Sequence, residues 1–498
     1  MKKKILYNIM SGVGGKIIVM VLSFIVPRLM LTNYGSEING LFTTLSNIYS
    51  YLAIVEAGIG TSAIQLLYKP VMEHDWSAIN SILYTTKKYF HRCGYIYAIG
   101  VIVLTVTLPF TLQSSINGVY IALIALLQGS ASLVNFFVIA GMTSLLSAEG
   151  KDYVTNNISL FINIITSIAK IILVSLQVNI VLLQVAYFTI SLLSTTIYYI
   201  YFMRKYPWIN RKSGDNNFRL PQRGSFLVHN IIYLVFNNTD TIIISFFCGL
   251  KVASVYAIYN MVFSNVLGLV NTLFNSMKFT LGQTYNTDKN KYIVLHDTYK
   301  SYYCCFVFSV VTVIYILITP FIKLYTEGVT DIQYVDSYLP MLFCLVSLLS
   351  SCRSTESNLV NLTFHAKQTL WRAGLEAIIN LGISLVLIQF IGIYGCLLGT
   401  IIALLYRTND FIIYANRKIL NRNPVQAYIT VISNFLLFFI AVGICNRVNI
   451  IIMNYFEFCI YGFCLMVFML AVYFIVNSLT NLNGFRFVYK NVCSMLKH

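Results

Sequence analysis

Charged residues are scarce in this sequence. Asp, Glu, Lys and Arg together make up 10% of the 498 residues, whereas a soluble chain usually carries about 25%. A chain with so little charge cannot cover the surface of an ordinary soluble domain, so that class is excluded. Acidic residues are the scarcest, because 17 Asp and Glu stand against 34 Lys and Arg and leave a formal net charge of +17.

The sequence also lacks the motifs of nucleotide, metal and catalytic sites. Gly14-Gly15-Lys16 looks like the end of a phosphate-binding loop, but Met10 stands where that motif needs its first glycine, and Ile17 where it needs Ser or Thr. The 11 cysteines lie mostly within apolar runs and show neither metal-ligand nor disulfide spacing. Since no cluster of general acid, nucleophile or metal ligands is present, we expect no cofactor, no metal and no enzymatic activity.

Long hydrophobic runs are what the sequence has instead. Hydrophobic residues make up 58% of the chain, and runs of about 20 of them are long enough to cross a hydrocarbon core as helices. The sequence therefore predicts an all-α polytopic membrane protein with about 14 transmembrane helices. A surface helix over 76–92 is expected between the second and third spans. The approximate spans are 8–31, 39–67, 94–112, 118–147, 154–176, 180–203, 225–248, 253–279, 302–322, 337–360, 370–390, 393–414, 426–446 and 453–477.

Positive charge collects on alternate connectors. With the amino terminus inside, 27 of the 34 Lys and Arg residues fall in inner segments, and only Lys251, Lys323 and Arg447 fall in outer ones. This bias follows the positive-inside rule and predicts that both termini and the basic loop 204–223 are cytoplasmic. It also accounts for the net charge without a nucleic-acid partner.

The chain repeats itself weakly. The stretch YGSEINGLFTTLSNI (34–48) aligns with CGLKVASVYAIYNMV (248–262) at an offset of 214, which places Gly35 on Gly249. Farther on, at an offset of 213, Asp75 meets Asp288. We therefore expect two parallel halves, as some transporters have. The expected parts are six-helix bundles over 1–210 and 211–414, followed by two additional helices and a cytoplasmic tail over 415–498.

These features resemble a known family. The stretch YGSEINGLFTTLSNIYSYLAIVEAGIGTSAIQLLYKPVMEHD, the matching eighth span and IGIYGCLLGTIIALL between the eleventh and twelfth spans are similar to Wzx-type polysaccharide flippases. These belong to the multidrug/oligosaccharidyl-lipid/polysaccharide exporter (MOP) superfamily. The resemblance covers nearly the whole chain and implies two six-helix bundles around a central cavity. In the related lipid II flippases, two extra helices form a groove for the lipid tail, and the last two spans match them in number and position.

The resemblance also implies a function. Similar proteins move undecaprenyl-diphosphate-linked oligosaccharide units from the inner to the outer leaflet of the bacterial plasma (inner) membrane by alternating access, for surface polysaccharide assembly. The implied partners are the polyprenyl-diphosphate-linked oligosaccharide, membrane lipids, a polysaccharide polymerase and other assembly proteins. The alternative is a multidrug or organic-cation antiporter of the same fold, and Asp240 is the residue that favours it.

Charges inside the spans are the candidate site residues, because a charge at the bilayer centre costs about 2.5–3.5 kcal/mol and usually faces a cavity or a partner. For Lys16 and Arg28 the alternative is snorkelling to the interfaces. The resemblance favours a cationic track for a diphosphate, since similar flippases carry lumen-facing cations in the first spans. The candidate substrate-binding residues are Arg28, Lys16, Lys170 and Arg353.

Acidic residues in the spans are candidates for coupling or ion pairing: Glu56, Asp240 and Glu356. Glu56 has three open roles, because it could carry a proton, bind a coupling cation or neutralise a nearby arginine. Arg353 and Glu356 are three residues apart and could form a structural ion pair on one helix face.

Overall fold

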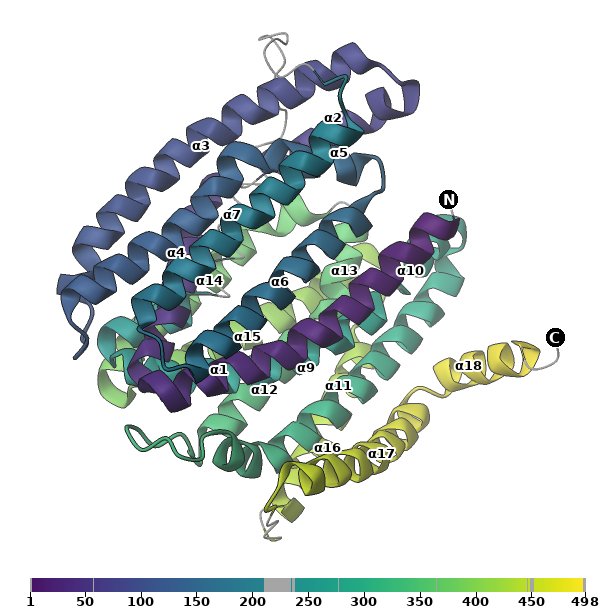
Figure 1. Ribbon diagram of the computed structural model, residues 1–498. Helices are drawn as coiled ribbons and strands as arrows, with labels where there is room; N and C mark the ends of the chain where they lie inside the picture. Colours follow the sequence, from purple (N-terminus) through teal and green to yellow (C-terminus); the bar gives the residue numbers. More distant parts are fainter. Residues whose placement is uncertain are drawn as a thin grey trace. The chain divides into compact units, whose positions relative to one another are not determined.

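A computed structural model describes residues 2–56, 58–209, 234, 238–275, 277–363, 365–445, 447 and 452–495. The described residues are almost entirely helical and contain no strand (Figure 1). Eleven of the described helices are long and apolar enough to cross a membrane. The protein is therefore an all-helical, multi-pass membrane protein, as predicted. Half of the expected seventh span and most of the basic loop 204–223 lie outside the described residues.

Contacts divide the chain into two compact units, Met1–Ala257 and Ile258–His498. The first unit also contains a helical segment, 238–247, and the start of α9 (Leu250–Asn275). A short 3-10 turn, Ala53–Glu56, joins its first two helices. The other helices of this unit are α1 (Lys2–Leu52), α2 (Ile59–Glu73), α3 (Trp76–Thr111), α4 (Gly118–Val138), α5 (Ala140–Ala148), α6 (Asp152–Ser175) and α7 (Ile180–Lys205).

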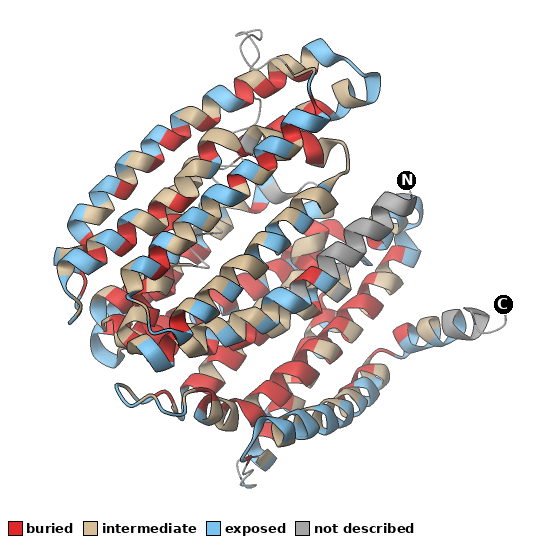
Figure 2. Ribbon diagram, in the orientation of Figure 1, coloured by how far each residue is buried: buried red, intermediate tan, exposed pale blue. Residues whose placement is uncertain are grey.

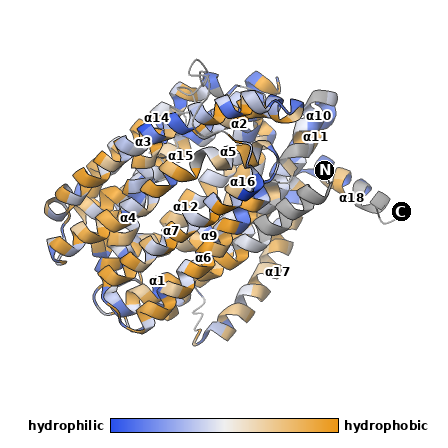
Figure 3. Cartoon of the chain, turned by 45° about the horizontal axis from the view of Figure 1, so that its top comes forward, coloured by the Kyte–Doolittle hydropathy of each residue, from blue (hydrophilic) through white to orange (hydrophobic). Residues whose placement is uncertain are grey.

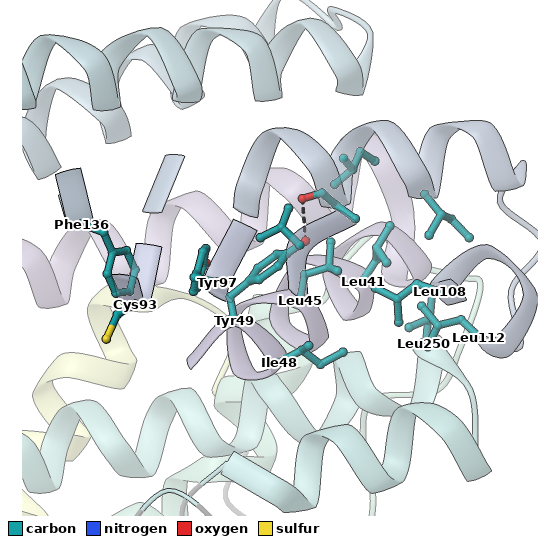
Figure 4. Close-up of a cluster of buried hydrophobic side chains, with 14 of the residues drawn as sticks. Leu41, Leu45, Ile48, Tyr49, Cys93, Tyr97, Leu108, Leu112, Phe136 and Leu250 are labelled. Atoms are coloured by element: carbon teal, nitrogen blue, oxygen red, sulfur yellow. Dashed lines mark hydrogen bonds between the residues drawn. The ribbon is translucent and has the colours of Figure 1, made fainter. Parts of the chain in front are cut away.

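The core of the first unit lies where α1, α3 and α4 meet (Figure 4). Tyr49 packs beside Tyr97, with ring centroids 6.3 Å apart, and its hydroxyl donates to the carbonyl of Ala125 over 2.6 Å. The apolar side chains Ile99, Val103 and Phe110 of α3 are exposed instead. Successive members are four and seven residues apart, which keeps them on one helix face. In a membrane protein such a face meets lipid. Figure 3 shows this apolar colouring along the helices.

The second unit is built around α11 (Lys289–Tyr325), which is buried along most of its length (Figure 2). The last spans, α16 and α17, pack against it, and α17 is largely exposed on its other side. The other helices of this unit are α10 (Met277–Thr287), α12 (Leu339–Cys352), α13 (Ser354–Leu362), α14 (Leu370–Ile391), α15 (Ile393–Tyr414), α16 (Val425–Cys445), α17 (Tyr455–Thr480) and α18 (Leu482–Met495).

Helices α14 and α15 approach each other through small residues. A Cβ added to Gly395 would lie 2.4 Å from the backbone of Leu387, and one added to Gly399 would lie 2.3 Å from the Ser384 hydroxyl. Glycines four residues apart allow two membrane helices to pack backbone against backbone. Any side chain at Gly395 would force these helices apart.

Local structure recurs at the spacing seen in the sequence. Gly35 and Gly249, which the repeat aligns, both have positive φ, 82° and 87°, a conformation that glycine adopts without a Cβ penalty. Asp75 caps the start of α3 by accepting from the Ala78 amide, and Asp288 caps α11 in the same way. Both caps fix where a long helix begins.

Helix breaks recur as well. The α4–α5 break falls at Ile139 and the α12–α13 break at Arg353, which are 214 residues apart. The ends of α5 and α13, Ala148 and Leu362, are also 214 residues apart. The two pseudo-repeated bundles are thus visible in the element bounds, although few side chains match.

Three expectations about element bounds need correction. The predicted surface helix 76–92 is the first part of α3, which continues without interruption to Thr111. The ninth span is far longer than 302–322, because α11 begins at Lys289. The second, fourth and tenth spans are each broken before their carboxyl ends, the second of them by the turn Ala53–Glu56. Hydropathy marks only the apolar part of a helix. The helix itself continues through polar residues, because its backbone hydrogen bonds continue until a helix-breaking residue is reached.

Candidate functional site

A cavity within the first unit contains Lys170 (here the Lys170 cavity). It has a volume of about 340 Å³. Helix α6 supplies Lys170, α4 supplies Gln128, and α7 supplies Gln184 and Tyr187. Helix α1 contributes residues on both sides of its bend at Gly35. These α1 residues are Val26, Pro27, Met30, Asn39, Phe42, Thr43 and Ser46.

Lys170 is held in this cavity without an acidic partner. Its ammonium lies 4.9 Å from the centre of the Tyr187 ring, a cation–π contact. Among the described residues, no carboxylate lines the cavity or forms an ion pair with Lys170. An ammonium in an apolar span needs a compensating charge or strong acceptors. The cavity is therefore suited to an anionic group.

The two cations of the first span are placed differently. Arg28 is half-buried on α1, and its carbonyl accepts a hydrogen bond from the Thr32 hydroxyl over 3.1 Å. Its neighbours Pro27 and Met30 line the Lys170 cavity, whereas Arg28 itself does not. The side chain of Lys16 lies outside the described part of the chain. The phosphate-binding roles of Arg28 and Lys16 stay predictions.

A second cavity of the first unit contains Glu56 (here the Glu56 cavity). It is larger, about 570 Å³. Glu56 ends the 3-10 turn between α1 and α2, because Gly58 then takes a positive φ of 84° and starts a new helix. The lining is rich in side-chain hydroxyls, which come from Thr61, Thr143, Ser144, Ser147, Thr155, Ser159, Ser194 and Tyr198, with the Asn135 amide beside them.

The same three helices line both cavities. On α4, Gln128 lines the Lys170 cavity and Asn135 lines the Glu56 cavity. On α7, Tyr187 lines the Lys170 cavity and Ser194 lines the Glu56 cavity. Both pairs are seven residues apart, about 10 Å along a helix. The first unit thus contains a basic cavity and, about two helical turns along the same helices, a cavity that is acidic and rich in hydroxyls.

Asp240 belongs to neither cavity lining. It is buried in the segment 238–247, where the Tyr256 hydroxyl donates to its carboxylate over 3.3 Å. The neighbouring Thr239 hydroxyl is hydrogen-bonded to Tyr51 of α1. This carboxylate therefore sits among hydroxyl partners between α1 and α9, and its coupling role stays a prediction.

The expected pair of Arg353 with Glu356 is replaced by two ion pairs with other partners. Glu356 is fully buried and pairs with Lys300 of α11, and its second oxygen accepts from the Thr355 hydroxyl. Arg353 pairs with Glu376 of α14. The break between α12 and α13 at Arg353 interrupts the regular face on which the two residues were expected to meet.

A wider charge network in the second unit joins two arginines and two carboxylates of α14 and α15. Arg407 of α15 lies 3.3 Å from Glu376 and 2.6 Å from Asp410, and Arg372 of α14 donates to Asp410 over 2.5 Å. The guanidinium of Arg407 also stacks 3.9 Å from the centre of the Phe411 ring. The sequence signal was the three-residue spacing of Arg407 and Asp410 within the last turns of an apolar run.

Solved structures with the same fold are membrane transporters. An inward-facing multidrug-resistance MATE family transporter of the MOP superfamily superposes with a TM-score of 0.63 at 13% identity, over 81% of this chain and 95% of its own. The lipid II flippase MurJ, in an inward closed conformation, superposes with a TM-score of 0.62 at 15% identity, over 98% of this chain and 100% of its own. A MOP superfamily transporter from Pyrococcus furiosus has a TM-score of 0.55 at 12% identity, over 85% of this chain and 97% of its own.

No protein-family profile matches the sequence, and no curated protein is similar to it in sequence. At identities of 12–15% the likeness concerns the architecture and not the substrate. The chain has the fold of the MOP superfamily transporters.

Proposed function

We propose that the protein is a flippase that moves undecaprenyl-diphosphate-linked oligosaccharide units from the inner to the outer leaflet of a bacterial plasma membrane by alternating access. A polysaccharide polymerase and other assembly proteins would then receive the units. The observation that carries the proposal is Lys170, an ammonium in a polar cavity whose described lining contains no acid. A diphosphate supplies the anionic oxygens that such a group requires.

The extent of the structural likeness supports the same proposal. The structural match to the lipid II flippase covers 98% of this chain, whereas the matches to two MATE transporters cover 81% and 90%. Two further apolar helices, α16 and α17, follow the second bundle. A long polyprenyl tail needs an apolar surface of its own, and helices added beside a bundle can provide it.

A multidrug or organic-cation antiporter remains the second candidate. Glu56 and the buried Asp240 favour it, because an exported cation needs acidic residues in its path. These two carboxylates lie in the same unit as Lys170, so the charges alone support either substrate.

Deletion of the gene tests the proposal. We expect completed, undecaprenyl-linked units to accumulate in the inner leaflet, and the surface polymer to disappear. Mass spectrometry of extracted lipids and immunoblotting of surface polysaccharide measure the two quantities. Unchanged polymer together with new sensitivity to cationic drugs would instead support the antiporter.

A further inference from the structure

Several polar side chains in the Glu56 cavity have no hydrogen-bond partner among the described residues. Within the described residues, the side chains of Glu56, Thr61, Asn135 and Ser194 make no hydrogen bond, and the buried Thr155 hydroxyl has no partner either. They come from five elements, the 3-10 turn, α2, α4, α6 and α7. The Thr155 hydroxyl is buried, and a buried polar group is nearly always paired. Glu56 and Ser194 are half-buried and Thr61 and Asn135 are exposed, so all five groups are free to bind an occupant of the cavity.

We propose that the Glu56 cavity binds the saccharide part of the transported molecule, an uncharged and hydroxyl-rich sugar chain. This inference rests on the proposed flippase function and names the part of the substrate that this cavity holds. Three of the five groups are hydroxyls, those of Thr61, Thr155 and Ser194, and each can both donate and accept. The Asn135 amide donates through nitrogen and accepts through oxygen, and the Glu56 carboxylate only accepts. Sugar hydroxyls also donate and accept, so they can satisfy all five groups at once.

The size of the cavity disfavours a small metal cation. A hard cation gathers six to eight oxygens at about 2.3–2.6 Å in a closed cage. A space of about 570 Å³ is far larger than such a cage, and it falls within the range of about 300–1,000 Å³ of small-molecule sites. The aromatic faces in the described lining are those of Phe90 and Tyr198, so a sugar ring has a surface to stack on.

The position of the cavity fits a ligand that continues from a phosphate. The Lys170 cavity lies about 10 Å away along α4 and α7. A diphosphate near Lys170 would therefore place the sugars attached to it at the level of Glu56. One ligand would then occupy both the Lys170 cavity and the Glu56 cavity, which share three helices.

Equilibrium binding to the purified full-length protein in nanodiscs tests the inference. The two probes are undecaprenyl diphosphate, and undecaprenyl diphosphate carrying the repeat unit extracted from the deletion strain. We expect the wild-type protein to bind the glycosylated probe at least tenfold more tightly than the bare probe. Thr61→Val and Ser194→Ala should each weaken the glycosylated probe by about three- to tenfold, and Glu56→Gln by more, while the bare probe is unaffected.

Thr189→Val is the matched control, because Thr189 is exposed on α7 and bonds only to carbonyls of its own helix. It should change neither affinity, and unchanged binding of the bare probe shows that each cavity variant is folded. Equal affinity of the wild type for both probes, or equal losses for both in the variants, would overturn the saccharide site and leave the flippase standing. If neither probe binds, or no repeat unit accumulates, the proposed function itself fails. Binding of rhodamine 6G that Glu56→Gln abolishes would assign the cavity to organic cations instead.

Discussion

Lys170 is the residue whose replacement should affect transport most directly. Lys170→Met keeps the length and apolar stem of the side chain but removes the ammonium. Because a hydrogen bond to a charged group contributes about 1.5–3 kcal/mol, we expect transport to fall by roughly ten- to a hundredfold. Lys170→Arg should retain much of the activity. Complementation of the deletion strain, with membrane abundance checked by immunoblot, measures the effect.

The control for Lys170 is an exposed lysine on the neighbouring helix. Lys205 lies at the end of α7 and is exposed to solvent, so Lys205→Met removes the same charge without touching the cavity. Full activity of Lys170→Met would remove the main support for an anionic substrate.

Arg28→Ala tests a second cation of the first unit, because Arg28 does not line the Lys170 cavity. A defect in Arg28→Ala would support the predicted phosphate track along α1.

The pair of Lys300 and Glu356 should act on stability rather than on transport specificity. Both side chains are almost completely buried, and breaking a buried pair leaves one uncompensated charge, at a cost of about 3–5 kcal/mol. Lys300→Met and Glu356→Leu should each lower the melting temperature in detergent strongly. The double variant should recover much of the loss, because it leaves no charge behind.

A solvent-exposed pair provides the comparison for this experiment. Lys69 and Glu73 are one helical turn apart on α2, at 3.8 Å, with most of both side chains in solvent. Such pairs contribute little, so Lys69→Met should leave the melting temperature unchanged. A double variant of Lys300 and Glu356 less stable than either single variant would show that the pair is needed as a pair.

At the scale of elements, α1 forms a close contact with the segment that leads into α9. A Cβ at Gly40 would lie 1.9 Å from the Leu250 carbonyl oxygen. Asn39 donates to Ser254 over 2.8 Å, and the Thr44 and Ser245 hydroxyls are 2.5 Å apart. By the predicted topology this contact is at the outer ends of the spans. Under the proposed alternating access, we expect this contact to open during each cycle.

Cross-linking tests whether this contact opens. Thr44→Cys with Ser245→Cys should form a disulfide on mild oxidation, identified by mass spectrometry of the joined peptides, and transport should stop until a reductant is added. Either single cysteine variant treated with the same oxidant is the control. Full transport by the cross-linked protein would mean that these elements move as one body.

Much of this element structure could be predicted from the sequence. The predicted span 393–414 has the same bounds as α15, and the aligned Gly35 and Gly249 both mark bends with positive φ. The partners of the buried charges could not be predicted, because Lys300 and Glu356 are 56 residues apart and only tertiary packing brings them together. The cavity around Glu56 was missed for a related reason. Its hydroxyls come from four helices, one to three from each, and each looks unremarkable in its own apolar run.

At the scale of the whole molecule, charge predicts the orientation in the membrane. Inner segments hold 27 Lys and Arg residues and outer segments hold 3. We therefore expect alkaline phosphatase fused after Arg223 to be inactive, because the enzyme folds only outside the cytoplasm. A fusion after Lys251, on a predicted outer connector, is the matched control and should be active. High activity after Arg223 would reverse the orientation.

The length of α3 and α11 has a mechanical consequence. They contain 36 and 37 residues, so each is about 54 Å long, well beyond a hydrocarbon core of about 30 Å. Their only internal prolines, Pro109 and Pro320, lie close to the carboxyl ends, and the remainder of each helix contains no proline to bend it. Each helix is therefore expected to be stiff over most of its length and to extend beyond the bilayer. By the predicted topology the aspartate-capped ends of both helices face the cytoplasm. A fluorophore placed at either end would therefore report a tilt of that helix from the aqueous side.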